Sequence, residues 1–216
     1  MEAYAVIGLG LFGSMVARQL HANGENVIAI DADPAKVEAM ADHVTRAVTA
    51  DAKNRDVLDR LGVHKCKCAI VAMAGDLATS VLVTMNLKAI GVPEIICKAR
   101  TSTDKEILET LGATTVIIPE HVAAHKLYHK LVSPNVLEYI ELSSDYSIIE
   151  MKAPSDWCSR SIRDINVRAK YGVNIIALRR ENETSIALNP EKVIGEDDVL
   201  VILGDNDSLA KVQELE

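Results

Sequence analysis

Six short apolar runs, each followed by an amphipathic stretch long enough for a helix, alternate along residues 1–135 of this chain. Each run is almost continuously apolar, as expected for strands that are covered on both faces. Such alternation is typical of a parallel sheet with helices on both sides, and it predicts an α/β domain with a Rossmann-like, doubly wound sheet. The expected strands are 4–7, 26–30, 46–49, 68–72, 94–98 and 115–118.

The pattern changes at Ser133-Pro134-Asn135. Beyond it the sequence predicts a small α+β domain over 136–216, with 9 basic and 16 acidic residues against 14 and 15 in 1–135. We expect a short helix near 162–170 and a last helix from residue 208. The expected strands of this domain are 136–142, 147–152, 174–180, 185–188 and 199–203.

Composition excludes several classes of function. A formal net charge of -8, a pI of about 5.3 and 3% aromatic residues disfavour a nucleic-acid partner, because phosphate binding needs clustered Lys and Arg. No segment approaches the roughly 20 apolar residues that cross a bilayer. The start of the chain has no signal-peptide pattern, and the four scattered cysteines suit a reducing compartment. We therefore expect a cytoplasmic location.

A glycine motif, Gly8-Leu9-Gly10-Leu11-Phe12-Gly13, directly follows the first expected strand and opens the first expected helix. Its glycines permit a tight turn, a close approach to phosphate and close helix packing. Asp31 ends the second expected strand and can bind both ribose hydroxyls. The residues after Asp31 offer no immediate cation for a 2′-phosphate, so the motif predicts a nucleotide site that disfavours NADP.

The second domain offers little for hydride transfer. All six histidines lie at or before His129, and no Tyr is followed by a Lys four residues later. A protein that binds a nucleotide without catalysing a reaction is therefore the favoured interpretation. The alternative is a small NAD-dependent oxidoreductase or redox sensor.

Several further runs carry a resemblance. They are Ala5–Gly13, 29–31, 112–120, 135–137 and, most specific, Asn166-Val167-Arg168-Ala169-Lys170-Tyr171-Gly172. On these residues the chain resembles the RCK (KTN) regulatory subunits of bacterial potassium uptake systems, of the KtrA/TrkA type. The resemblance implies a cytoplasmic subunit that forms a homodimer and then an octameric ring. The ring would dock at the inner face of the cell membrane on a potassium-translocating subunit of the KtrB/TrkH type, and ATP or ADP would gate it.

The resemblance also implies a set of nucleotide-binding residues. The glycines would hold phosphates, Asp31 the ribose, and Asp51 with Ala52 the adenine edge, while Glu120 would also help to hold a divalent cation. The full expected set is Gly8, Gly10, Leu11, Phe12, Gly13, Asp31, Asp33, Asp51, Ala52, Ala74, Lys98, Arg100 and Glu120.

Leu11 departs from the pattern of the RCK regulatory subunits, which commonly have Arg after the second glycine. Arg there can reach a terminal phosphate, and its loss removes a charge-assisted contact of about 1.5–3 kcal/mol. Weak discrimination between ATP and ADP is therefore expected, and AMP, NAD or NADH become credible ligands.

The second domain resembles modules that bind cyclic di-AMP between two subunits. The matching positions are Ile162, Asn166, Arg168, Asn174, Ile175 and Pro190. Arg163 departs from the family, which often has an apolar residue there. The alternative is that Arg168 and Lys170 form only a solvated helix face.

Three weaker patterns have plain alternatives. His121, His125 and His129 recur every four residues and could share a metal, but a solvated or interface stripe is favoured. Glu196, Asp197 and Asp198 could hold a cation, although acids in a turn are more often solvated. Cys66 and Cys68 are expected to be packing residues rather than metal ligands.

Overall fold

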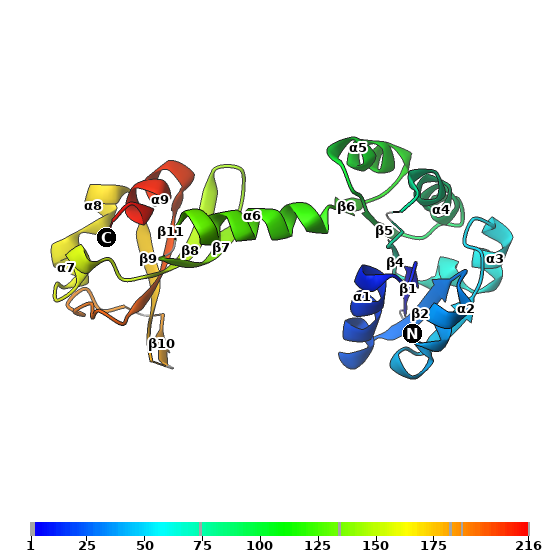
Figure 1. Cartoon of the computed structure of the whole chain (residues 1–216), viewed down its shortest axis with the longest axis horizontal. Helices are drawn as coiled ribbons and strands as arrows, with labels where there is room; N and C mark the ends of the chain where they lie inside the picture. Colours follow the sequence, from blue (N-terminus) through cyan, green and yellow to red (C-terminus); the bar gives the residue numbers. More distant parts are fainter. Residues whose placement is uncertain (1–2, 74, 134, 182, 187, 216) are drawn as a thin grey trace. The chain divides into compact units, whose positions relative to one another are not determined.

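The computed structural model describes residues 3–73, 75–133, 135–181, 183–186 and 188–215. The chain divides into two compact units, 1–120 and 121–216, and Figure 1 shows the order of their elements. The predicted boundary at residue 135 would assign the helix before it to the first domain, whereas all but the start of α6 (Pro119–Val132) belongs to the second unit. None of the described helices combines the length and apolar character that a bilayer crossing requires.

The first unit contains a six-stranded sheet in the order β3-β2-β1-β4-β5-β6, and every neighbouring pair is parallel. This is the doubly wound order of the Rossmann fold, so the predicted fold class is confirmed. The strands are β1 (Ala3–Ile7), β2 (Asn26–Asp31), β3 (Arg46–Thr49), β4 (Cys68–Val71), β5 (Glu94–Lys98) and β6 (Thr115–Ile117).

Side chains of neighbouring residues on β1 enter separate apolar clusters on the two faces of this sheet. Ala5 and Ile7 belong to one cluster, and Val6 belongs to the other. This alternation explains why the strands are continuously apolar, since each face is covered. The first unit's helices within the described chain are α1 (Leu11–Ala22), α2 (Pro34–Glu38), α3 (Arg55–Arg60), α4 (Leu77–Ala89) and α5 (Ser102–Leu111).

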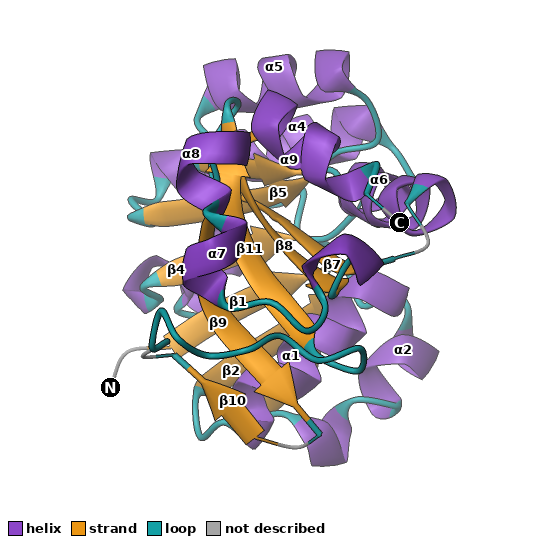
Figure 2. Cartoon of the chain, turned by 90° about the vertical axis from the view of Figure 1, so that its left-hand side faces the viewer, coloured by secondary structure: helices purple, strands orange, loops and turns teal. Residues whose placement is uncertain are grey.

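The second unit has an antiparallel sheet in the order β10-β9-β11-β8-β7. One helix, α9 (Asn206–Gln213), packs on β8 and β11, and α8 (Val167–Tyr171) packs on α9 and β9 (Figure 2). Their shared core includes the fully buried Trp157 and Met151. The strands are β7 (Val136–Glu141), β8 (Tyr146–Lys152), β9 (Asn174–Arg180), β10 (Glu183–Ser185) and β11 (Val199–Asp205).

Two expectations for the second unit need correction. The helix expected over 162–170 is two short helices, α7 (Ile162–Ile165) and α8, separated by Asn166 in the left-handed conformation at φ 51°. Asn can separate the helices in this way, because it is one of the few residues other than Gly that adopts the left-handed region readily.

The strand expected at 185–188 lies earlier, at Glu183–Ser185, where β10 pairs with β9 in an antiparallel arrangement.

The buried carboxylate of Asp198 accepts several hydrogen bonds in the turn before β11. Asp198 is 1% exposed and accepts two hydrogen bonds from Arg180, at 2.7 Å and 2.8 Å. The backbone N–H of Gly195 donates to the same carboxylate at 2.8 Å. The guanidinium of Arg180, assisted by this N–H, lowers the pKa of Asp198 against the opposing effect of burial. Asp198 is therefore a buried structural residue, so the expectation of a solvated acid is wrong for this position, and its pairing with Arg180 also speaks against a cation site.

We expect Asp198→Asn to lower the unfolding free energy by about 1.5–3 kcal/mol at pH 7, the range for a hydrogen bond to a charged group. Because the folded-state pKa of Asp198 is lowered, the ion pair stabilises the fold above about pH 4, the ordinary Asp value. This stabilisation is lost as the pH falls through the folded-state pKa. Calorimetric melting of both proteins should therefore converge in acid. Asp197→Asn, at the exposed neighbour, is the control, and equal stability at pH 7 would contradict the assignment.

Candidate nucleotide-binding site

The first and third glycines of the motif are required by the packing around them. Gly8 has φ +94°, and a Cβ there would lie 2.5 Å from Cγ of Met73. A Cβ on Gly13 would overlap the carbonyl oxygen of Gly8 and lie 2.9 Å from Cβ of Ala72. These two glycines let α1 start close against the ends of β1 and β4.

The second glycine differs from the other two, because a Cβ on Gly10 would have no atom within 4 Å apart from those of its chain neighbours. Gly10 is the N-cap of α1 and has extended backbone angles that any residue adopts, φ -68° and ψ -172°. It has no side chain to accept from the first N–H groups of the helix, so they remain available to an anion. The space beside Gly10 therefore suits a phosphate group.

The carboxylate of Asp31 lies directly beside this loop. It accepts a hydrogen bond from the backbone N–H of Leu9 at 2.7 Å and another from Asp33 at 2.9 Å. Its side chain is 12% exposed, and each oxygen keeps a lone pair for a further donor such as a ribose hydroxyl. Lys36 lies 3.8 Å from Asp31 and 3.9 Å from Asp33, so two carboxylates already match its charge.

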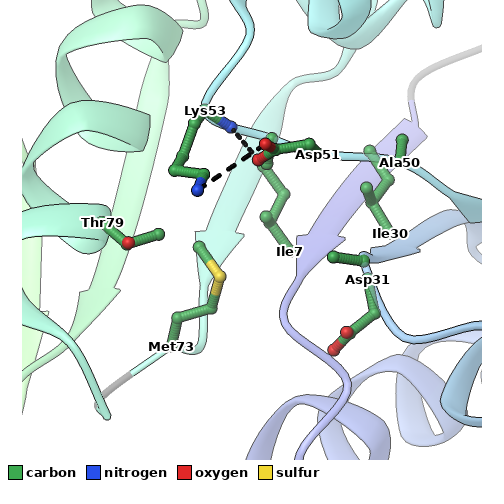
Figure 3. Close-up of a pocket in the computed structure, with 10 residues that line it drawn as sticks. Ile7, Ile30, Asp31, Ala50, Asp51, Lys53, Met73 and Thr79 are labelled. Atoms are coloured by element: carbon green, nitrogen blue, oxygen red, sulfur yellow. Dashed lines mark hydrogen bonds and ion pairs between the residues drawn. The ribbon is translucent and has the colours of Figure 1, made fainter.

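A cavity of about 240 Å³ opens at the carboxyl ends of the strands, where ligands bind in open α/β sheets. Met73 and Thr79 face it from one side, and Ile30 with Asp31 faces it from another (Figure 3). Asp51 lies at its rim, where it accepts from the backbone N–H of Lys53 at 3.0 Å. The lining residues are Ile7, Ile30, Asp31, Ala32, Ala50, Asp51, Ala52, Lys53, Met73 and Thr79.

An ion pair joins the end of β5 to the start of α6. Lys98, whose side chain is 15% exposed, donates to Glu120 at 2.7 Å. This hydrogen bond lowers the pKa of Glu120. The ammonium of Lys98 also lies 5.7 Å from the ring centre of Phe12, in the first turn of α1. A cation is thus held close to the start of α1.

The remaining predicted residues have mixed placements. Asp33 caps α2 by accepting from Ala35 at 3.0 Å, which gives this carboxylate a structural role. Arg100 lies 3.9 Å from Asp104, and Leu11 is 83% exposed at the start of α1. Ala74 lies outside the described residues.

Sequence reasoning missed Met73, Thr79 and Lys53. One signal was available, because residues just after parallel strands meet at one edge of the sheet, and this applies to Met73 and Lys53. Thr79 lies in the first turn of α4, five residues beyond Ala74, so only the tertiary structure brings it to the cavity.

In the second unit, the structure brings several of the expected cyclic di-AMP residues together. The guanidinium of Arg168 donates to the side-chain oxygen of Asn174, which opens β9. The carbonyl of Pro190 accepts from Arg163 at 2.9 Å, next to Ile162. Asn166 links the two short helices, and Ile175 packs at the edge of the core.

The metal alternatives gain no support from the described part of the chain, which holds no group of three or more His, Cys, Asp or Glu side chains placed to bind a metal ion. His121 and His125 line a hollow with Glu138, but Glu138 already pairs with Lys126 at 2.6 Å. The side chain of His129 lies outside the described structure. Burial raises the pKa of Cys68 to about 12, so this thiol stays protonated as a packing residue.

The strand order, the open N-terminus of α1 and the acid at the end of β2 define the first unit as a Rossmann-type domain with a candidate nucleotide site. Residues 4–119 match the TrkA-N domain, and residues 146–216 match the TrkA-C domain. The chain belongs to the family of proteins that carry these two domains, which confirms the resemblance to RCK regulatory subunits of potassium uptake systems.

Two curated relatives come from Bacillus subtilis (strain 168). The chain is 40% identical over 203 residues to Ktr system potassium uptake protein A, covering 94% of this chain and 91% of the relative. It is 35% identical over 213 residues to Ktr system potassium uptake protein C, covering 99% and 96%. Both are named as potassium uptake proteins rather than enzymes, in line with the expectation that this chain is not an enzyme.

Among solved structures, the GsuK channel bound to NAD shares the fold. Its TM-score is 0.67 at 16% sequence identity, and the match covers 99% of this chain and 39% of that chain. At this identity the likeness shows the fold alone.

The two glycines with opposite surroundings give a matched test. We expect Gly10→Ala to leave the unfolding free energy within about 1 kcal/mol of wild type, because nothing contacts the added methyl group. It should nevertheless abolish thermal stabilisation by ADP, since the methyl group occupies the phosphate position. Gly13→Ala should destabilise the protein by about 1–3 kcal/mol through overpacking. Melting curves with and without ADP measure both effects, and an undiminished ADP shift in Gly10→Ala would exclude this loop as the phosphate site.

Proposed function

We propose that this protein is a regulatory subunit that binds an adenine nucleotide in its first unit and thereby gates a membrane potassium transporter or channel. The observation that carries the proposal is the unfilled space at Gly10, beside the carboxylate of Asp31. A phosphate at the helix N-terminus and a ribose at Asp31 would occupy this arrangement together. The names of the Ktr relatives support the link to potassium uptake.

The base would lie in the cavity between Ile30 and Met73, with its edge toward Asp51. A carboxylate accepts hydrogen bonds from an exocyclic amino group, which adenine has at the edge where guanine has a carbonyl oxygen. ATP, ADP, AMP and NAD(H) share this base. NADP is disfavoured, because its 2′-phosphate would meet Asp31 and Asp33.

Discrimination among these nucleotides depends on charge near the terminal phosphate. Leu11 projects into solvent at the first position of α1 and brings no cation, so we propose similar affinities for ATP and ADP. Lys98 is the cation held near this helix start, and its partner is Glu120. We also propose that Glu120 helps to hold a divalent cation, which would compete with Lys98 for the carboxylate.

Regulation would act through assembly. The described part of α6 exposes the apolar side chains of Val122, Leu127 and Leu131, the kind of surface that a partner commonly covers. We propose that a second copy of the chain covers this surface in a homodimer, that dimers build an octameric ring, and that the ring docks at the inner face of the membrane on a KtrB/TrkH-type subunit. Nucleotides would act by binding two ring shapes with different affinity.

The nucleotide proposal is tested at Asp31. We expect Asp31→Ala to weaken ADP, ATP and NADH binding by about tenfold to a hundredfold, corresponding to about 1.5–3 kcal/mol for a hydrogen bond to a charged group. Isothermal titration calorimetry measures the affinities. Asp42→Ala removes an exposed carboxylate outside the cavity and is the matched control. Unchanged affinities in Asp31→Ala would refute the proposed site.

We further propose that the second unit binds cyclic di-AMP between two copies of the chain. The favouring observation is the contact between Arg168 and Asn174, which places a guanidinium beside an amide that can recognise a base edge. In a domain with 9 basic and 16 acidic residues, an anionic ligand needs such placed cations. The two-fold symmetry of the ligand suits an isologous interface.

For this second ligand we expect Arg168→Ala to weaken binding of cyclic di-AMP to the whole chain by about 1.5–3 kcal/mol, since each copy loses a charged hydrogen bond. Asp31→Ala should leave this affinity unchanged, because Asp31 belongs to the other unit. Titration calorimetry with both variants separates the two sites. If Arg168→Ala binds like wild type, the cyclic di-AMP assignment fails and the nucleotide proposal is unaffected.

A further inference from the structure

A second exposed guanidinium lies next to the candidate cyclic di-AMP residues. The side chain of Arg163 is 66% exposed and forms an ion pair with Glu191, whose side chain is 56% exposed. Both residues are neighbours in sequence of candidate ligand residues, since Arg163 follows Ile162 and Glu191 follows Pro190. The pair therefore lies beside Ile162 and Pro190, two residues of the candidate site.

The backbone around Arg163 is fixed although its side chain is exposed. The N–H of Arg163 donates to the carbonyl of Pro190 at 2.9 Å, and the N–H of Ile162 donates to Lys192 at 3.1 Å. The turn that follows is fixed as well, because the side chain of Asn189 accepts from the N–H of Glu191 at 3.0 Å. Two short segments thus fix the backbone of Arg163 beside Pro190, from which its side chain can reach a ligand bound at Ile162 and Pro190.

The partner of Arg163 can be exchanged readily. An ion pair between two exposed side chains contributes little to stability, since water competes for both charges. A guanidinium binds a phosphate through two parallel hydrogen bonds, which are among the stronger polar contacts in proteins. Arg163 would therefore leave Glu191 for a phosphate group that arrives at the site.

We propose that Arg163 is a second phosphate-binding residue of the cyclic di-AMP site, and that Glu191 lowers the affinity by holding Arg163 in the free protein. This inference rests on the proposed binding of cyclic di-AMP. Two copies of the chain would supply Arg168 and Arg163 twice, so four guanidinium groups would face a ligand with two phosphates. An apolar residue at this position could only pack against the ligand. Arg163 would also bind its phosphate, and the competing ion pair with Glu191 would set how strongly it does so.

The test is titration calorimetry of the whole chain with cyclic di-AMP at two salt concentrations. Arg163→Leu should weaken binding about tenfold and reduce its salt dependence, because one phosphate contact per subunit is lost. The affinity of Arg163→Lys should lie between those of wild type and Arg163→Leu, since lysine keeps the charge but lacks the planar guanidinium that binds a phosphate through two hydrogen bonds. Glu191→Gln should strengthen binding several-fold. The double variant should match Arg163→Leu, because Glu191 acts only through Arg163.

Arg160→Leu is the matched control, since Arg160 is an arginine of the same segment whose guanidinium binds the carbonyls of Asp156 and Asp164. Its affinity should equal that of wild type, and the melting temperatures of all variants report any loss of folding. If Arg168→Ala weakens binding while Arg163→Leu binds like wild type, the role of Arg163 is overturned and the cyclic di-AMP proposal stands. If wild type binds no cyclic di-AMP at millimolar concentration, both are overturned.

Discussion

The hydrogen bond from the backbone of Leu9 to the carboxylate of Asp31 connects the two parts of the nucleotide site. Leu9 belongs to the glycine loop after β1, and Asp31 ends β2, the strand paired in parallel with β1. The hydrogen bond and the strand pairing hold the loop and the acid together, so the proposed positions for phosphate and ribose would be set before a ligand binds. Such preorganisation reduces the ordering that a ligand must impose on the protein.

The two units differ in whether their key polar groups have hydrogen-bond partners within the protein. In the first unit, the start of α1 leaves backbone N–H groups open beside Gly10. In the second unit, the buried carboxylate of Asp198 is matched by Arg180, and the hydroxyl of Ser147 bonds to Tyr139 at 2.7 Å. Residues 1–135 are nearly neutral, with 14 basic and 15 acidic residues, so the open N–H groups at the start of α1 are a candidate anion site. An acidic second unit can bind an anion only where exposed arginines are placed for it.

The sequence predicts the first unit well, because continuously apolar strands and the glycine motif each report a strict local requirement. It predicts less of what depends on distant contacts. The break at Asn166 follows from a single backbone conformation, and the pairing of Lys98 with Glu120 joins residues 22 positions apart. The expected motif positions therefore identify the loop and Asp31, whereas Thr79 becomes part of the cavity only through the packing of α4.

Gly10 has a consequence for how this protein evolves. The backbone carbonyl of Gly10 accepts a hydrogen bond from Ser14, but a Cβ at this position would meet no residue other than its chain neighbours, so the fold does not require a glycine there. If Gly10 holds a phosphate as proposed, selection for that ligand preserves the glycine. Among descendants that no longer sense a nucleotide, substitution should therefore accumulate first at position 10, whereas Gly8 and Gly13 should persist as long as the fold itself does.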